Sequence, residues 1–330
     1  MIPIVDGHND ALLEAWVRGS DLRKRDAAPH FDLVRAHEGG FAAGFFAVFV
    51  PSRDDGAIDA EREGDPLDPE RARRVADELV AILLALEDAG GLVVARSVAD
   101  VERAVAGGPL AAILHVEGAE PLDPELTRLE PLVDRGLRSL GLAWSRPNAF
   151  ATGTPWRGDE DTGPGLTAAG RNLVRACNEL GVLVDLSHLN AAGFADVAEL
   201  SRAPLVATHA PARALWAAPR ALSDEQLRRI GGSGGVAGIP LVAELLRADG
   251  AFDPHTPLRV FAEHVEHVVD VIGVDHVALG SDLDGGALLE EVGDAAGLQR
   301  ALEALGWSES ELRKLAHENW LRVLRATWKE

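Results

Sequence analysis

Short apolar runs alternate with longer amphipathic stretches along most of this chain. The short runs are rich in Val, Ile, Leu and Phe, which is typical of buried strands in a parallel sheet, and the longer stretches have helical spacing. The pattern predicts eight strands, over residues 3–5, 42–50, 111–116, 139–143, 182–186, 205–208, 235–239 and 276–280. It predicts helices over 69–87, 167–180, 223–230, 258–272 and 309–327.

Eight strands with helices between them favour a (β/α)8 barrel of the TIM type. No low-complexity linker or repeat divides the 330 residues, so we expect one domain, residues 1–330. The last helix, 309–327, is expected to pack outside the barrel. The stretches 51–68 and 148–165 are rich in turn-forming residues, and we interpret them as long loops that could cover a site.

Composition and charge narrow the function classes. A 47% hydrophobic content suits a globular protein with a large core. Lys and Arg total 32 against 53 Asp and Glu, a net charge of -21, which repels nucleic acid and anionic membrane surfaces. One cysteine cannot form a disulfide within the chain, and we find neither a leader-type segment nor an apolar run long enough to cross a bilayer. We therefore expect a cytoplasmic protein with no nucleic-acid or membrane partner.

Polar side chains follow five of the predicted strands directly. In a barrel of this type, the residues at the carboxyl-terminal ends of the strands form the active site. Those residues are Asp6, His8, Asp10, Glu117, His188, His209, Asp282 and Asp284. A mixed set of imidazoles and carboxylates suits Zn²⁺ or a similar divalent ion. His8 and Asp10 are two residues apart and so face the same side of an extended strand, as a chelating pair must.

Each of these residues has a simpler interpretation when taken alone, because a His or Asp at a strand end more often caps a helix or a turn. Their number makes a metal site the stronger hypothesis. His115 lies two residues before Glu117 and so points to the same face of the strand. It could support the metal ligands from behind or fill the barrel interior, and we favour the second role. His264 and His267, in "EHVEH", lack the zincin spacing, so a solvated helix face is expected there.

The chain also resembles the renal, or membrane, dipeptidases and their bacterial relatives, which are metal-dependent hydrolases of the amidohydrolase type. The segments that carry the resemblance include "VDGHND", "HVEGAE", "GLTAAGRNLVRACNELGVLVDLSH", "PLVATHAPARAL", "PRALSDEQLRRIGGSGGVAGI" and "HVALGSDLDG", in family order over nearly the whole chain. The resemblance implies a barrel that hydrolyses dipeptides, including L-Xaa-D-Xaa substrates, through a water shared by two divalent ions, expected to be Zn²⁺. It also suggests a homodimer.

Carried over residue by residue, the resemblance implies a role for each member of the strand-end set. His8 and Asp10 would bind one ion, His188 and His209 the other, and Glu117 both. Asp282 matches the family's catalytic acid near the bridging water, and Arg220 matches the arginine that holds the substrate's terminal carboxylate. The alternative for Arg220 is a surface ion pair with Asp224 or Glu225.

One position departs from the family. Trp144 stands where typical members have a histidine that is proposed to steady the scissile carbonyl. An indole N–H donates one hydrogen bond and carries no charge, so the substrate could differ. Two alternatives stay open: hydrolysis of another amide, a lactone or a β-lactam, and a barrel that binds a metal or small ligand without turnover.

Overall fold

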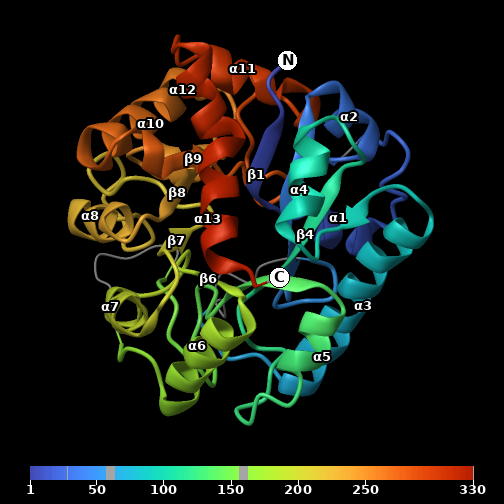
Figure 1. The fold of residues 1–330 in the computed structure, drawn as a ribbon, viewed down its shortest axis with the longest axis vertical. Coiled ribbons are helices and arrows are strands. Elements are labelled where there is room, and N and C mark those ends of the chain that lie inside the picture. The colour runs from blue at the N-terminus through green and yellow to red at the C-terminus, as the bar shows by residue number, and fades with distance from the viewer. Residues whose placement is uncertain (28, 57–63, 156–162, 330) are drawn as a thin grey trace.

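The computed structural model describes residues 1–27, 29–56, 64–155 and 163–329, and within them the strands form one parallel sheet that curves into a barrel (Figure 1). The strands are β1 (Ile4–Asn9), β2 (Phe41–Phe49), β3 (Val93–Val94), β4 (Ala111–Glu117), β5 (Leu137–Gly141), β6 (Leu183–Asp185), β7 (Val206–Ala207), β8 (Val236–Ile239) and β9 (Val277–Leu279). Around the barrel the order is β1, β2, β4, β5, β6, β7, β8, β9, while β3 pairs with β4 outside this ring. The predicted (β/α)8 barrel is confirmed, and the short strand β3 is an addition that the sequence pattern did not reveal.

The barrel closes where the chain leaves β9 and meets β1. The backbone N–H of Asp282 donates to the carbonyl of His8 over 3.0 Å, and the N–H of Asp10 donates to the carbonyl of Leu283 over 2.8 Å. These bonds extend the parallel pairing beyond the last residue of β9. Closure therefore brings the polar ends of the first and last barrel strands side by side.

Helices surround the barrel (Figure 1). They are α1 (Ala11–Arg18), α2 (Leu33–Glu38), α3 (Pro69–Asp88), α4 (Val98–Val105), α5 (Leu129–Asp134), α6 (Ala168–Leu180), α7 (Ala191–Leu200), α8 (Asp224–Gly232), α9 (Ala243–Leu246), α10 (Arg259–Ile272), α11 (Leu298–Glu303), α12 (Glu309–Arg313) and α13 (Asn319–Thr327), with 3-10 turns Val274–His276 and Ala295–Gly297. Several begin where the sequence predicts. Thr167 caps α6 by accepting from the N–H of Gly170, and Ser223 forms a capping box with Gln226 at the start of α8.

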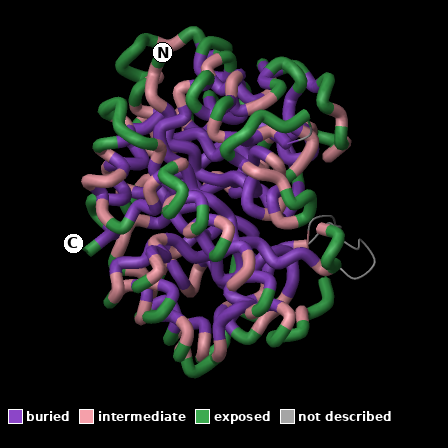
Figure 2. Tube along the Cα trace, turned by 90° about the vertical axis from the view of Figure 1, so that its right-hand side faces the viewer, coloured by how far each residue is buried: buried purple, intermediate pink, exposed green. Residues whose placement is uncertain are grey.

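Residues of β4 that point to opposite faces belong to two different apolar cores. On β4, Leu114 and Val116 pack outward against the surrounding helices, whereas Ile113 joins the apolar filling of the barrel. Buried backbone follows the strands through the middle of the molecule, and exposed positions lie around its rim (Figure 2). Glu117, at the end of β4, shares the inward face with Ile113, which places its carboxylate inside the barrel mouth.

The last helical segment differs from the prediction that it packs outside the barrel. It is divided into α12, a π-helical turn over Lys314–Glu318, and α13, and α13 runs across the end of the barrel that faces the viewer in Figure 1. The fully buried Trp320 belongs to the same apolar cluster as Val5 and Phe45, and its indole N–H donates to the carbonyl of Leu279 over 3.0 Å. A large indole thus plugs the amino-terminal end of the barrel.

Tight backbone packing surrounds the carbonyl of Thr208, which precedes His209. A Cβ atom at Gly238 or Gly280 would lie 1.9 Å from this oxygen, and one at Gly7 would lie 2.4 Å from it. Only glycine leaves room for the neighbouring strands at such separations. The end of β7, and with it His209, is therefore held against three other strand backbones.

Two further predictions have separate outcomes. His264, on α10, is buried and bridges two backbone groups, so the prediction of a solvated helix face is wrong for this residue. The loops 51–68 and 148–165 lie partly outside the described residues, since 57–63 and 156–162 are not described. In the part of the chain that the structure describes, we find no helix with the length and hydropathy of a membrane span.

Candidate metal and active site

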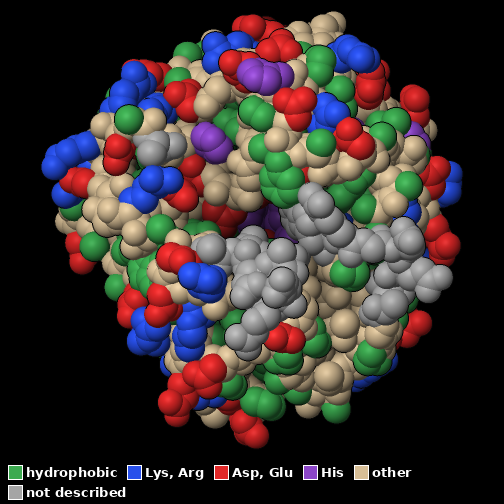
Figure 3. Space-filling view, turned by 180° about the vertical axis from the view of Figure 1, so that it is seen from behind, with side chains coloured by type: hydrophobic (Ala, Val, Ile, Leu, Met, Phe, Trp, Pro, Cys, Tyr) green, Lys and Arg blue, Asp and Glu red, His purple; other side chains and the backbone are tan. Residues whose placement is uncertain are grey.

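A cavity of about 740 Å³ opens at the carboxyl-terminal ends of the strands. The molecular face opposite to that of Figure 1 is hollowed at its centre, and histidine side chains lie inside the hollow (Figure 3). Residues named from the sequence that line the cavity are Asp10, Glu117, Trp144, His188, His209, Asp282 and Asp284. The strand-end pattern thus identifies one continuous cavity.

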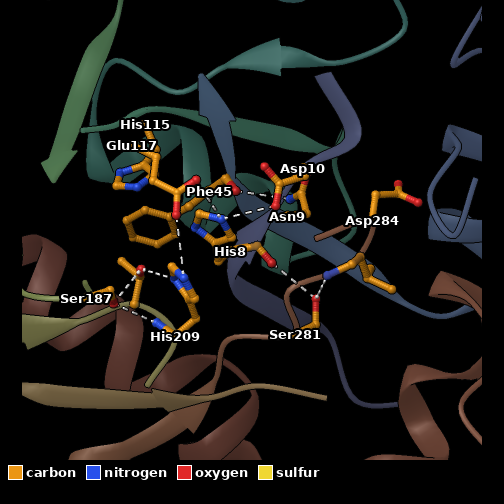
Figure 4. Close-up of polar contacts among 12 residues, drawn as sticks. His8, Asn9, Asp10, Phe45, His115, Glu117, Ser187, His209, Ser281 and Asp284 are labelled. Carbon is orange, nitrogen blue, oxygen red and sulfur yellow. Dashed lines mark hydrogen bonds and ion pairs between the residues drawn. The ribbon is translucent and has the colours of Figure 1, made fainter. Parts of the chain in front are cut away.

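The carboxylate of Glu117 lies between the rings of His8 and His209 (Figure 4). Its Oε2 lies 3.6 Å from Nε2 of His8. Its Oε1 lies 3.1 Å from Nε2 of His188 and 3.6 Å from Nε2 of His209. Asp10 approaches Nε2 of His8 from the other side, with its Oδ2 at 3.5 Å. Each oxygen of the Glu117 carboxylate therefore has at least one imidazole nitrogen nearby.

Hydroxyl groups behind the rings of His188 and His209 fix which nitrogen of each ring faces the cavity. The hydroxyl of Thr208 donates to Asp185 over 2.6 Å, so it can accept from Nδ1 of His209, which lies 3.0 Å away. Ser145 Oγ lies 3.1 Å from Nδ1 of His188. A proton on each Nδ1 leaves Nε2 with a free lone pair, the arrangement usual in metal-binding histidines.

The donor atoms at this place fit divalent cations. Nδ1 and Nε2 of His8 and Oδ1 of Asp10 are buried and have no hydrogen-bond partner within the described residues. The Nε2 atoms of His188 and His209 lie 3.0 Å apart, both facing the Glu117 carboxylate. Lone pairs that converge without a donor between them cost free energy unless a cation joins them.

The same residues form three overlapping groups whose donor atoms lie within 4.8 Å of one another. They are His8 with Asp10 and Glu117, Glu117 with His188 and His209, and His8 with His209 and Asp282. All members are buried. Imidazole and carboxylate donors in such sets are the ligands that Zn²⁺ and similar ions take in proteins.

Burial and nearby charges raise the pKa values of some of these candidate ligands and lower those of others. Burial raises the pKa of Glu117 to about 8 and that of Asp282 to about 7. Burial opposes protonation of His8, but the negative charges of Glu117 and Asp10 outweigh it and raise the pKa of His8 to about 10. Burial, with the positive charges of Arg220 and His8, holds the pKa values of His188 and His209 well below the ordinary value. A bound cation would favour the ionised carboxylates and the neutral rings at once.

Strained backbone conformations coincide with the site. His188, Asp282 and Asp284 have φ values of 64°, 60° and 67°, in the left-handed region that is unfavourable for residues with a Cβ. Such conformations cost about 1–3 kcal/mol each and persist where surrounding contacts fix them. For His188 and Asp282, the conformation directs the side chain into the cavity rather than along the strand.

A second layer of polar residues lies beneath the cavity. Asp6 accepts from the N–H and the hydroxyl of Ser281, over 2.6 and 2.8 Å, so it positions the residue before Asp282 rather than joining the candidate ligands. His115 contacts Ser139 through Nδ1 and lies 3.6 Å from Asp185 through Nε2. His115 is fully buried and adjoins the Asp185 carboxylate that orients Thr208, so it lies behind a candidate ligand, the role that we did not favour.

Arg220 is only 3% exposed, so the alternative of a surface ion pair is wrong. Its Nη2 donates to the carbonyl of His209 over 2.7 Å, while Nε and Nη1 have no partner within the described residues. Asp224 instead pairs with Arg228 and His267. The guanidinium is therefore held beside a candidate ligand with two donors left for another acceptor.

Trp144 lines the cavity between two aromatic rings. Its ring centre lies 5.0 Å from that of Phe49 and 5.7 Å from that of His188. The guanidinium of Arg146 lies 4.9 Å from the Trp144 ring, and Arg146 pairs with the buried carboxylate of Glu120 over 3.0 Å. The residue that departs from the family pattern is thus a rigid part of the cavity wall.

Sequence reasoning missed three residues of this region. Arg146 and Glu120 lie on different loops, and the pattern gave no sign that they meet. Glu244, on α9, also lines the cavity. An acidic residue shortly after the apolar run of β8 was a signal that could have found it, because it too follows the carboxyl-terminal end of a barrel strand.

The sequence matches one peptidase family over nearly its whole length. Residues 1–329 match the model of the membrane dipeptidase family, peptidase family M19. An uncharacterized protein encoded in the pqqA 5' region of Klebsiella pneumoniae is 43% identical over 274 residues, which cover 81% of this chain and 99% of that protein. The dipeptidase verJ of Clonostachys rogersoniana is 28% identical over 98% of this chain and 84% of its own length.

A solved structure shows the same fold throughout. A metallopeptidase from Rhodobacter sphaeroides, crystallised with a phosphinate mimic of the dipeptide L-Ala-D-Ala, superposes with a TM-score of 0.92. It is 42% identical, and the match covers 99% of each chain. The chain therefore belongs to the membrane dipeptidase family, peptidase family M19, and is a metal-dependent dipeptidase.

Proposed function

We propose that this enzyme hydrolyses dipeptides with two Zn²⁺ ions held at the strand ends. The observation that carries the proposal is the position of Glu117, with His8 near one carboxylate oxygen and His188 and His209 near the other. In this assignment His8 and Asp10 hold one ion, His188 and His209 hold the second, and Glu117 binds both. Bound in this way, the ions would supply Lewis-acid polarisation of the scissile carbonyl and a water of lowered pKa.

Asp282 is assigned as the group that moves the proton. It lines the cavity, and its carboxylate lies among the donor atoms of His8 and His209. A buried carboxylate at this place can accept a proton from the attacking water and return it to the leaving amine. Its left-handed backbone conformation holds it in the cavity for both steps.

Arg220 is assigned to the terminal carboxylate of the substrate. The unpaired Nε and Nη1 lie on opposite sides of the guanidinium, so each can donate one charge-assisted hydrogen bond to a carboxylate oxygen. The peptide bond of a dipeptide lies next to such a carboxylate, so this contact would favour dipeptides over longer chains. Replacing Arg220 with alanine should raise KM for a dipeptide far more than for the corresponding dipeptide amide. Equal effects on both substrates would refute the assignment.

Trp144 is assigned as a wall of the substrate pocket. Its ring supplies apolar surface beside His188, where the family histidine would supply a polar donor. The Rhodobacter sphaeroides relative was crystallised with a mimic of L-Ala-D-Ala, and its 42% identity supports L-Xaa-D-Xaa dipeptides as the substrate class for this chain. In this assignment a small D-residue of the substrate would pack beside the Trp144 ring.

The test is hydrolysis of a dipeptide panel, including L-Xaa-D-Xaa members, by metal-free protein and by protein reconstituted with Zn²⁺, with the bound metal counted. Turnover that reaches its maximum near two ions per chain supports the proposal. Two bound ions without dipeptide turnover would reject the substrate and direct the same measurement to other amides, lactones and β-lactams. Failure to bind metal would reject the ligand assignment. The cytoplasmic location and the homodimer stay predictions.

A further inference from the structure

Glu244 lies in the short helix α9, which follows β8 at the mouth of the barrel. Its side chain lines the cavity, although the residue is only 1% exposed. Both carboxylate oxygens contact the backbone N–H of Ala287, over 3.1 and 3.2 Å. These contacts fix the direction of the carboxylate, but a single N–H supplies no charge to balance it.

Two other acidic residues of the cavity wall have partners that Glu244 lacks. Glu14 forms an ion pair with Arg18. Asp284 accepts from the N–H groups of His30 and Phe31, over 2.5 and 3.2 Å, and the His30 ring lies 3.5 Å away. Within the described residues, no Lys, Arg or His side chain pairs with Glu244.

Glu244 is also separate from the candidate metal ligands, since it belongs to none of the three donor groups. It lies near them, because a Cβ at Gly286 would lie 2.0 Å from Glu244 Oε1, and one at the preceding Gly285 would lie 2.1 Å from Asp282 Oδ1. Two glycines thus leave open the space beside both carboxylates. A buried carboxylate without a counter-charge is costly, so a cationic ligand that reaches it would bind strongly.

We propose that Glu244 binds an ammonium group of the substrate and so selects dipeptides that carry one on the amino-terminal side of the cleaved bond. The inference rests on the proposed function, in which Arg220 holds the opposite, carboxylate end. The charge of Glu244 favours a cation at its own place in the cavity wall, because no Lys, Arg or His side chain of the described residues pairs with it. Burial raises the pKa of Glu244, and an ammonium partner would return it to the charged form.

The ammonium group could be the substrate's α-amine or the end of a lysine side chain, and three substrates distinguish these sources. They are L-Ala-D-Ala, N-acetyl-L-Ala-D-Ala and L-Lys-D-Ala, assayed with Zn²⁺-loaded wild type and the Glu244→Gln variant. Glutamine keeps the shape and an acceptor for Ala287 but removes the charge. Where the N-acetyl compound is cleaved too slowly, its Ki as a competitive inhibitor replaces kcat/KM.

If Glu244 binds the α-amine, Glu244→Gln lowers kcat/KM for L-Ala-D-Ala by about tenfold to a hundredfold and leaves the N-acetyl compound nearly unchanged. If it binds a side-chain amine, the loss is confined to L-Lys-D-Ala. Either result supports the proposal. An equal loss of kcat/KM on all three substrates, or no loss on any, overturns the proposal for Glu244. The proposed function would still stand in that case, provided that the wild type hydrolyses dipeptides. Absence of all dipeptide turnover by the wild type would overturn both.

Glu14→Gln is the matched control, because it removes one negative charge from the same cavity wall but from a residue already paired with Arg18. It should change selectivity far less than Glu244→Gln, and an equal change would mean that the total charge of the cavity matters rather than this contact. Metal content and Tm are compared for every variant. If Glu244→Gln does not fold, Glu244→Asp keeps the charge, and it should retain the preference for L-Ala-D-Ala over its N-acetyl form.

Discussion

The guanidinium of Arg146 lies 4.9 Å from the ring centre of Trp144, at the wall of the cavity. The same guanidinium donates from Nε to Glu120 over 3.0 Å and from Nη2 to the carbonyl of Val50 over 2.6 Å. The Arg146 and Glu120 side chains are buried, so water does not screen their attraction. This buried pair fixes the plane against which the indole packs, and the orientation of Trp144 depends on it.

Replacing Glu120 with glutamine should destabilise the protein by about 3 kcal/mol, because the charge of Arg146 would stay buried without its counter-charge. Urea unfolding of metal-loaded protein measures the change. Glu309→Gln is a matched control, since Glu309 pairs with Arg313 on the surface, and an exposed pair contributes little. Equal stability of the Glu120→Gln variant and the wild type would show that the pair is not needed to hold Arg146.

Trp144 itself should affect substrate binding more than folding. Trp144→Ala removes the aromatic surface between Phe49 and His188 and should raise KM for L-Ala-D-Ala by roughly tenfold, with kcat changed less. Trp144→Phe keeps an aromatic wall and should stay close to wild type. Steady-state kinetics of the wild type and both variants, at equal metal content, measure these changes in KM and kcat. A fall in kcat with unchanged KM would instead place the indole near the reacting carbonyl.

The candidate ligands could be predicted from the sequence because the carboxyl ends of parallel strands meet at one end of a barrel. His8, Glu117, His188 and His209 each follow a different apolar run, so knowledge of the fold class was enough to bring them together. No register or side-chain detail was needed. The same rule predicted the cavity that Glu117, His188 and His209 line.

Contacts between loops could not be predicted in this way. Glu120 and Arg146 meet only because the loops after β4 and β5 pack together, and neither loop has a periodic pattern. The position of α13 was missed for a related reason. The apolar stripe that predicts a helix does not say whether it covers the outside of the barrel or plugs its end, and Trp320 decides this through its contacts with Phe45 and Leu279.

Metal binding should stabilise the folded protein. A ligand that binds only the native state at a hundred times its Kd adds about 2.7 kcal/mol, so chelation should lower Tm and added Zn²⁺ should restore it. Glu117→Gln should reduce this shift, because Glu117 belongs to two of the three donor groups. Asp284→Asn is the control, since Asp284 lines the same cavity but belongs to none of them. Calorimetric scans with and without Zn²⁺ measure both shifts, and a Glu117→Gln shift equal to that of the wild type would contradict the ligand assignment.

His264 gives a prediction about pH at a position away from the candidate ligands. Its Nδ1 accepts from the N–H of Ala212 over 3.1 Å, and its Nε2 lies 2.9 Å from the carbonyl of Leu246, at the end of α9. A neutral ring satisfies both contacts. Burial lowers the pKa of His264 from 6.5 to about 4. The contribution to stability is therefore full above the unfolded pKa of 6.5 and is lost as the pH falls toward 4.

The stability difference between wild type and a His264→Gln variant should accordingly shrink as the pH falls from 7 to 4, by at most about 3 kcal/mol at 1.36 kcal/mol per pKa unit. Urea unfolding of both proteins at several pH values measures it, and the other titrating groups cancel because both proteins carry them. Val265→Ala, a buried neighbour that does not titrate, should cost the same stability at every pH. If the difference for His264→Gln stayed as constant as that for Val265→Ala, the folded protein would be holding a protonated His264, and one of its two backbone contacts would have to break.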